Sequence, residues 1–187
     1  MVRDIHPDEA IQLIVAAAGK AYPKSITENV RLDEALGRRL AKTYNSPIDH
    51  PPFTKASMDG FAYSRRAQEG VHSVTQTIAA GGPWPEAISG SDVARIMTGA
   101  PLPGGADAVQ RIEWTEEAGQ DSQGRPLVRF TKQETGGNVI EQGENLKAGQ
   151  TLLTPRVLMP QDIGILAAAG IAQPQAAARP RVVVVST

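Results

Sequence analysis

Short apolar runs separated by glycine- and proline-rich turns fill the middle of this chain, from about residue 47 to residue 146. Glycine and proline together make up 32 of the 187 residues, or about 17%, whereas their usual combined share is about 12%. Turns this frequent favour many short strands over a helical bundle. We expect strands at Phe61–Ser64, Val74–Ala80, Val93–Met97, Ala108–Glu113 and Leu127–Phe130.

Helices are expected on both sides of this β-rich stretch. Pro7 suits a first helical turn, two acids follow it, and Gly19 is a natural stop. Pro160 and Gly170 bound a second helix in the same way. The stretch Leu32–Ala41 has a weaker pattern, helical throughout or a helix followed by a strand, with Gly37 as an interruption.

Charge divides at the same places as the secondary-structure pattern. Residues 47–146 carry 8 basic and 13 acidic side chains, and the rest of the chain carries 11 basic and 7 acidic ones. A shift in composition at both ends predicts a β-rich domain of residues 47–146 inserted into a domain formed by residues 1–46 and 147–178. The expected fold class is therefore α+β and mostly β.

Composition excludes several classes of protein. The chain has no cysteine, so disulfides, thiolate metal sites and cysteine nucleophiles are absent, and its net charge of −1 argues against a nucleic-acid partner. Its longest apolar runs are too short to span a membrane, and its acidic N-terminus does not resemble a signal peptide, so we expect a cytoplasmic protein. Serine-hydrolase, dinucleotide-binding and P-loop motifs are missing as well.

The last seven residues, RVVVVST at 181–187, form a continuous β-branched run. Such a run is typical of a strand buried on both faces of a parallel sheet, and a parallel sheet needs further strands and crossover helices. We therefore expect residues 179–187 to be the first strand of a further, truncated domain, although a partner strand elsewhere in the chain is the alternative.

Two segments carry candidate chemistry. In SMDGFA at 57–62, Asp59 and Gly60 form a typical turn pair, which is the favoured interpretation, but Asp59 also stands beside apolar residues where a carboxylate could take a proton or orient a ligand. In RIMTGAPLPGGADAV at 95–109, a stiff loop with Thr98 and Gly99 follows a strand. An ordinary hairpin connection and a ligand-binding loop explain this second segment equally well.

No metal site is expected within this chain. His6, His50 and His72 are far apart in sequence and lack acidic partners at ligand spacing, so we expect them at the surface or in turns. Glu141 and Glu144 could bind a cation, but a solvated face explains them better.

Together these segments resemble the molybdopterin molybdenumtransferase family, which includes bacterial MoeA and the E domain of gephyrin. The resemblance rests on SMDGFA, on RIMTGAPLPGGADAV, on EALGRRLA at 34–41 followed by Ser46–Pro47, and on LAAAGI at 166–171 before RVVVVST. It implies an elongated first domain, a β-rich insert, and a pterin-binding α/β domain that begins with the strand at 179–187.

The resemblance implies a role in molybdenum cofactor biosynthesis. Members of the family insert molybdate into adenylylated molybdopterin and release AMP, with Mg²⁺ that would be bound mainly outside this chain. They act as homodimers with the active cleft between the insert of one subunit and the pterin-binding domain of the other. The 187-residue chain alone is therefore expected to be inactive. A non-catalytic dimerisation or scaffold module of the gephyrin type is the alternative.

The resemblance also assigns site residues. Asp59 matches the functional aspartate of the family's MDG motif, and Thr98 matches the threonine of its MTGAP motif, so both are expected to be catalytic. The adjacent Gly60, Gly99, Ala100 and Pro101 are expected to contact the substrate.

Two departures from the family pattern are visible. Thr54 and Lys55 stand where the family usually has an aspartate and an asparagine, and EQGEN at 141–145 stands where the family has an RRGED-like motif. Asn145 keeps the shape of the family's aspartate but carries no charge, so it serves neither as a base nor as an anionic ligand. The third functional position of the family is therefore not transferred to this chain.

Overall fold

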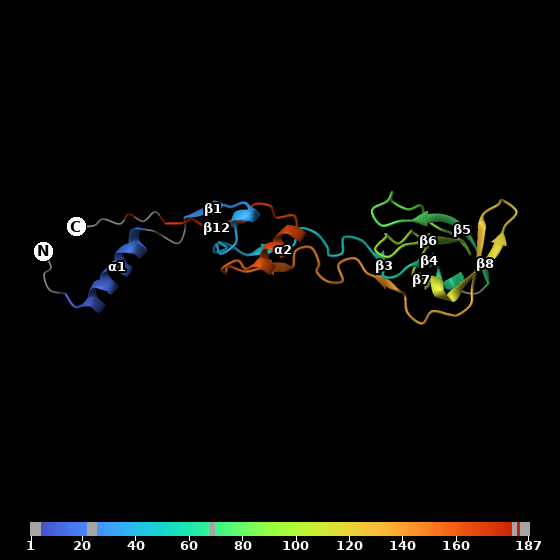
Figure 1. Ribbon diagram of the computed structural model, residues 1–187, viewed down its shortest axis with the longest axis horizontal. Helices are drawn as coiled ribbons and strands as arrows, with labels where there is room; N and C mark the ends of the chain where they lie inside the picture. The colour runs from blue at the N-terminus through green and yellow to red at the C-terminus, as the bar shows by residue number, and fades with distance from the viewer. Residues whose placement is uncertain (1–4, 22–25, 68–69, 181–182, 184–187) are drawn as a thin grey trace. The chain divides into compact units, whose positions relative to one another are not determined.

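A computed structural model describes residues 5–21, 26–67, 70–180 and 183. The chain divides into two compact units, one formed by Met1–Pro47 with Gly149–Thr187 and the other by Ile48–Ala148. In Figure 1 the strands of the first unit come from the blue-to-cyan and the orange-to-red parts of the chain, and the second unit is coloured from cyan-green to orange. None of the described helices is long and apolar enough to cross a membrane.

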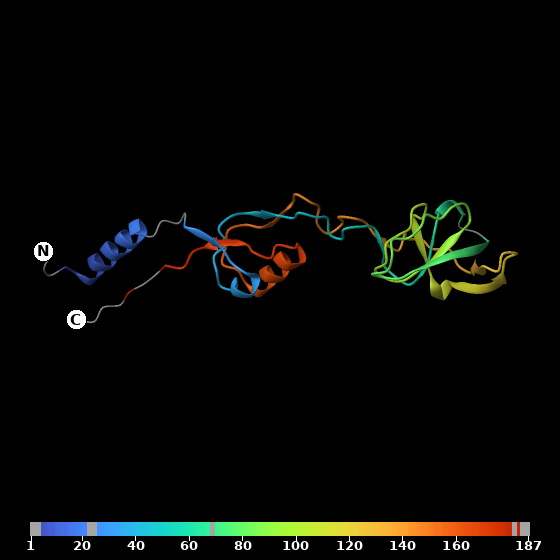
Figure 2. The same ribbon diagram turned by 90° about the horizontal axis from the view of Figure 1, so that it is seen from above.

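The second unit is built on one six-stranded sheet in the order β7-β4-β6-β5-β9-β8. Neighbouring strands are antiparallel, except that β5 and β6 are parallel and are joined by a crossover through residues 79–92. The two views in Figures 1 and 2 show that the sheet is strongly curved. A separate two-stranded pair joins β3 and β10. The strands of this unit are β3 (Lys55–Ala56), β4 (Gly60–Tyr63), β5 (Val71–Ile78), β6 (Val93–Ile96), β7 (Ala108–Arg111), β8 (Thr115–Gln120), β9 (Pro126–Phe130) and β10 (Val139–Ile140), with 3₁₀ turns at Arg65–Ala67 and Ile112–Trp114.

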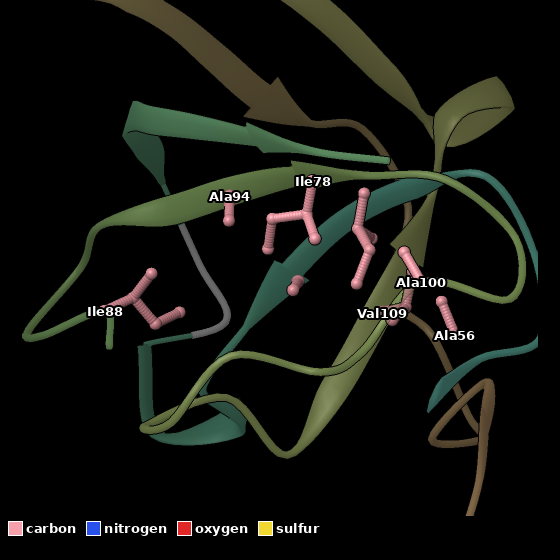
Figure 3. Packing of buried hydrophobic residues seen from close by; sticks show 8 residues of the cluster. Ala56, Ile78, Ile88, Ala94, Ala100 and Val109 are labelled. Carbon is pink, nitrogen blue, oxygen red and sulfur yellow. The ribbon is translucent and has the colours of Figure 1, made fainter. Parts of the chain in front are cut away.

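Strand β4 is buried on both faces. Its side chains alternate between two hydrophobic clusters, as the period of two in a strand requires. Ala62 belongs to a cluster that fills the space between the strands and their connecting loops (Figure 3), whereas Phe61 and Tyr63 belong to a cluster on the other face. All four β4 residues are buried. The members of the first cluster are Ala56, Ala62, Ile78, Ile88, Ala94, Ile96, Ala100 and Val109, and those of the second are Phe61, Tyr63, Val93, Ala108 and Val128.

The first unit consists of two short antiparallel pairs and two helices. Strands from the two ends of the chain pair with each other, β1 with β12 and β2 with β11. A third hydrophobic cluster holds them against helix α2. The elements are α1 (Pro7–Ala21), β1 (Thr27–Asn29), a 3₁₀ turn at Leu32–Glu34, β2 (Tyr44–Asn45), β11 (Thr151–Leu153), α2 (Pro160–Ala168) and β12 (Gln175–Ala177), and the cluster comprises Val30, Ala35, Leu40, Leu153, Leu158, Leu166 and Ala176.

Most of the expected elements are confirmed. The α+β, mostly β fold class is correct, and the five expected strands and both flanking helices are present. Helix α1 continues two residues beyond its expected stop at Gly19. In Leu32–Ala41 the structure is closer to the second of the two expected forms, with a short 3₁₀ turn followed by Arg39 and Leu40, which form isolated β-bridges to Val157 and Ala176. The strand expected at 179–187 lies outside the described residues, apart from Arg179, Pro180 and Val183.

Strand β8 was not expected, because its sequence TEEAGQ lacks apolar alternation. It forms because the turn after it directs the chain back along β9. The Asp121 carboxylate accepts hydrogen bonds from the amides of Gln123 and Arg125, at 2.8 and 2.9 Å, and from the Arg125 side chain at 2.7 Å. These bonds, the Arg125 amide first, lower the pKa of the Asp121 carboxyl to about 2. Turn chemistry therefore overrides the polar character of the strand.

The contact between β4 and β7 at Gly60 gives a direct test of the sheet. A Cβ at residue 60 would lie 1.9 Å from the backbone oxygen of Gln110. We expect Gly60→Ala to lower the free energy of unfolding by about 2–3 kcal/mol, because the obstacle is backbone rather than a movable side chain. Urea denaturation monitored by circular dichroism measures the loss.

The control for this test is Gly136→Ala, in the same unit. A Cβ there would approach only the Asn138 side chain, at 3.8 Å. We expect it to change the free energy of unfolding by less than about 0.5 kcal/mol. Equal midpoints for both variants would show that β4 and β7 are not paired in this register.

Candidate functional site

Asp59 and Thr98, which are 39 positions apart in sequence, meet at the surface of the second unit. Both the amide and the hydroxyl of Thr98 donate to the same carboxylate oxygen, Oδ1 of Asp59, at 2.7 and 2.6 Å. Both residues are exposed. The structure therefore brings together the two residues that the family resemblance assigns as catalytic, and neither is sealed beneath packed side chains.

The pairing of β4 with β6 produces this contact. Asp59 immediately precedes β4, and Thr98 follows β6 by two residues. The two strands are antiparallel, with Gly60 opposite Ile96, so the start of one lies beside the end of the other. On its other side, the backbone oxygen of Asp59 accepts a hydrogen bond from the Ile112 amide at 3.2 Å. Asp59 is therefore fixed by strands on both sides of it.

The hydrogen bonds from Thr98 extend to lower pH the range over which Asp59 stays ionised. The Thr98 hydroxyl, and after it the Thr98 amide, lower the pKa of the Asp59 carboxyl below its ordinary value of 3.8, with a smaller contribution from the positive charge of Arg95. Within the described residues, the second oxygen, Oδ2, has no hydrogen-bond donor. This carboxylate is suited to bind a cation or accept a ligand's proton donor, and it is a poor general base near neutral pH.

The loop that carries Thr98 is held by its own backbone. The amide of Gly99 donates to Ala56 at 2.8 Å, and the amide of Ala56 donates back to Ala100 at 3.0 Å. Figure 3 shows Ala56 and Ala100 side by side at one end of the cluster. Gly99 has a φ of +80°, which favours glycine. Its N–H group is thus already used in a bond within the chain.

The other residues expected to contact the substrate lie deeper. Gly60, Ala100 and Pro101 are all buried, and Gly99 is half-buried. In the structure these residues shape the loop and allow β4 to approach β7. Gly105, a further glycine of this loop, lies close to the backbone of Ile88, since a Cβ at Gly105 would lie 2.2 Å from the Ile88 oxygen. Substrate contact by these residues stays a prediction.

The segment EQGEN at 141–145 folds onto the Thr54 hydroxyl. This hydroxyl donates to the Glu141 carboxylate and accepts from the Gln142 amide, both at 3.1 Å. Glu144 accepts from the Glu141 amide at 3.0 Å, and the Gln142 side chain donates to Asp49 at 2.8 Å. The Glu141 carboxylate is thus engaged by Thr54, and the Glu144 carboxylate by the Glu141 amide. Thr54 connects this segment to the residues before β3. In the sequence, Thr54 is visible as a departure from the family pattern, and this contact was not predicted.

No metal centre is visible in the part of the chain that the structure describes, where no three His, Asp or Glu side chains gather. The expectation of a surface histidine is wrong for His72, which is 1% exposed. Its ring packs against Phe130 with centroids 4.4 Å apart and planes tilted by 34°, and its Nδ1 lies 3.0 Å from the backbone oxygen of Ser91. Both partners are distant in sequence, so the local sequence does not reveal the burial.

A separate cavity of about 670 Å³ lies over the curved sheet. Its lining includes the apolar side chains of Phe61, Val74 and Leu127 and the charged side chains of Arg95 and Glu117. Asp59 and Thr98 do not line it. Arg95 connects the two places electrostatically, since it lines the cavity and its charge also acts on Asp59.

Comparison with known proteins points to one family. Residues 5–170 match the family model described as the MoeA N-terminal region (domain I and II). The chain is 33% identical over 167 residues to a molybdopterin molybdenumtransferase from Staphylococcus epidermidis. This alignment covers 85% of this chain and 39% of that protein. It is also 33% identical over 187 residues to the one from Staphylococcus aureus, covering 96% of this chain and 42% of that protein.

A solved structure agrees with these relatives. The molybdopterin biosynthesis MoeA protein from Pyrococcus horikoshii superimposes with a TM-score of 0.76 at 26% identity, over 95% of this chain and 45% of that one. The chain spans about two fifths of the length of the curated relatives that it matches.

Thr98→Val tests the electrostatics of the pair. Valine retains the amide donor and the side-chain shape but removes the hydroxyl, which is the main cause of the lowered pKa. We expect the pKa of Asp59 to rise toward 3.8, as measured by the pH dependence of its carboxyl carbon shift in NMR. Thr98→Ser keeps the hydroxyl and should titrate like the wild type. Identical titration of the valine variant and the wild type would mean that the hydroxyl does not bond to Asp59 in solution.

Proposed function

The chain belongs to the MoeA N-terminal family, and we propose that it forms part of a molybdopterin molybdotransferase, with the Asp59–Thr98 pair as one wall of the active site. Two curated relatives carry the name of this activity. In the proposed reaction, molybdate is inserted into adenylylated molybdopterin and AMP is released. The single observation that carries the proposal is the exposed, ionised Asp59, whose carboxylate is held, among the described residues, through one of its two oxygens.

The proposed role of Asp59 is electrostatic. Its Oδ2 is a carboxylate oxygen, the ligand type that Mg²⁺ prefers, and one or two protein carboxylates plus substrate phosphates are a usual set for this ion. Mg²⁺, when bound, would offset the negative charge of the phosphate and molybdate oxygens. Thr98 would orient the carboxylate by holding Oδ1, so that Oδ2 points outward. The lowered pKa of Asp59 supports this role over proton abstraction.

The charge of the chain supports a divided active site. Residues 47–146 carry more acids than bases, yet the proposed substrate is a polyanion. Asn145 in place of the family's aspartate removes one negative charge, and EQGEN holds no arginine to bind phosphate. We therefore propose that most of the phosphate contacts come from another part of the protein, in a cytoplasmic homodimer whose partner subunit completes the cleft.

Asp59→Asn tests the proposed function in the full-length protein that carries these residues. Asparagine keeps the shape and can still accept from Thr98, but it loses the charge that binds a cation. We expect molybdenum insertion, followed as AMP release with adenylylated molybdopterin and molybdate, to fall about 10²-fold, as is typical for loss of one electrostatic contact in an active site. The fold and the oligomeric state should not change.

Glu116→Gln is the matched control, because it neutralises an exposed acid of the same unit on β8, a strand that carries neither residue of the pair. We expect it to retain wild-type turnover. Turnover at the wild-type rate by Asp59→Asn would remove Asp59 from the mechanism. If the wild-type full-length protein fails to restore molybdoenzyme activity in a cell that lacks the enzyme, the scaffold alternative is correct instead.

A further inference from the structure

An exposed tryptophan lies in the turn GGPWP at 81–85. Trp84 is 70% exposed, an unusual state for so large an apolar side chain. Its ring meets the half-buried Phe53 edge to face, with centroids 5.5 Å apart and planes at 88°. This contact braces the ring and leaves most of its surface open to solvent.

The turn that carries Trp84 is rigid. Pro83 and Pro85 on either side restrict its backbone. The side-chain amide of Gln76 holds the next residue at both polar groups, since its Nε2 donates to the Glu86 oxygen at 2.7 Å and its Oε1 accepts from the Glu86 amide at 3.2 Å. An aromatic ring on such a turn loses little conformational entropy when it binds a partner.

The turn also packs against the loop that carries Thr98. A Cβ built on Gly99, the residue after Thr98, would lie 3.9 Å from the Cβ of Ala80 at the start of the turn. Further along, the Ile88 amide donates to the Gly104 oxygen at 2.8 Å. The segment of Phe53 is tied to the same loop, because the Leu102 amide donates to the oxygen of Thr54 at 3.0 Å. Both aromatic residues thus stand on segments joined to the Thr98 loop.

We propose that Trp84, braced by Phe53, is a stacking platform for the planar nitrogen heterocycle of a ligand whose polar end reaches the Asp59–Thr98 pair. Purine and pterin rings share the chemistry required, a flat, electron-poor π-system that stacks on an electron-rich indole. This inference deepens the proposed function, because the substrate proposed there carries one ring of each kind.

Tryptophan fluorescence reports directly on this platform. The chain has two tryptophans, and the ring of Trp114 is covered by the Arg111 guanidinium and the Lys132 ammonium, 3.9 and 4.0 Å from its centroid. Trp114→Phe therefore leaves Trp84 as the sole tryptophan emitter. We expect saturable quenching of its emission on titration with AMP, with 6-carboxypterin, or with both, and the comparison shows which ring binds.

Matched probes and variants define the outcomes. Ribose 5-phosphate, which has the phosphate but no ring, should not quench. By calorimetry, Trp84→Ala should bind the quenching probe at least about tenfold more weakly, whereas Trp84→Phe should retain most of the affinity. Flat emission with both ring compounds up to millimolar concentration, or equal quenching by ribose 5-phosphate, would overturn the proposal. Circular dichroism confirms that each variant folds.

The platform and the proposed function fail in different ways. In the full-length protein, Trp84→Ala should raise the KM for adenylylated molybdopterin about tenfold with little change in kcat. Asp59→Asn should lower turnover and still show ring quenching. If the rings bind but no molybdenum is inserted, the stacking proposal stands and the proposed function is refuted. If Trp84→Ala inserts molybdenum with a wild-type KM, the proposed function stands and the stacking proposal is refuted.

Discussion

The close approach of β4 to β7 at Gly60 is the constraint on which the second unit depends. With no side chain at that position, β4 lies against β7 on one side and pairs with β6 on the other. Residues on both of its faces are buried, so the strand has no freedom to shift. Asp59 precedes this fixed strand and Thr98 follows its neighbour, so the geometry of the pair is inherited from the sheet.

The Asp59–Thr98 pair combines a fixed geometry with a carboxylate oxygen that can still accept a ligand. The Asp59 carboxylate accepts the amide and hydroxyl bonds of Thr98 through Oδ1, which lowers its pKa, and among the described residues Oδ2 has no hydrogen-bond donor. The turn interpretation and the functional interpretation of SMDGFA are therefore compatible, since the same carboxylate ties two strand ends together and faces solvent. Around it, buried small residues such as Ala100 hold the loop in place. An exposed acid on such a support changes little in position when a ligand arrives.

The sequence predicted those parts of the fold and the site that depend on residues close together in the chain. Short apolar runs, with glycine and proline at their ends, predicted the main strands and the helix at Pro160, since both signals are local. The family resemblance singled out Asp59 and Thr98. Long-range contacts were invisible: His72 is buried by partners distant in sequence, and β8 forms because the Asp121 turn directs a polar segment along β9. Thr54 joins the Glu141 segment across 87 positions, which no local pattern reveals.

The acidic character of β8 has a consequence for how molecules of this protein meet one another. This strand forms one border of the six-stranded sheet, where unpaired backbone groups would otherwise recruit a strand from a second molecule. Glu116 and Glu117 on it are exposed, and the same strand on an approaching copy would bring like charges face to face. The sheet is thereby protected from growing across molecules, which favours solubility in a crowded cell.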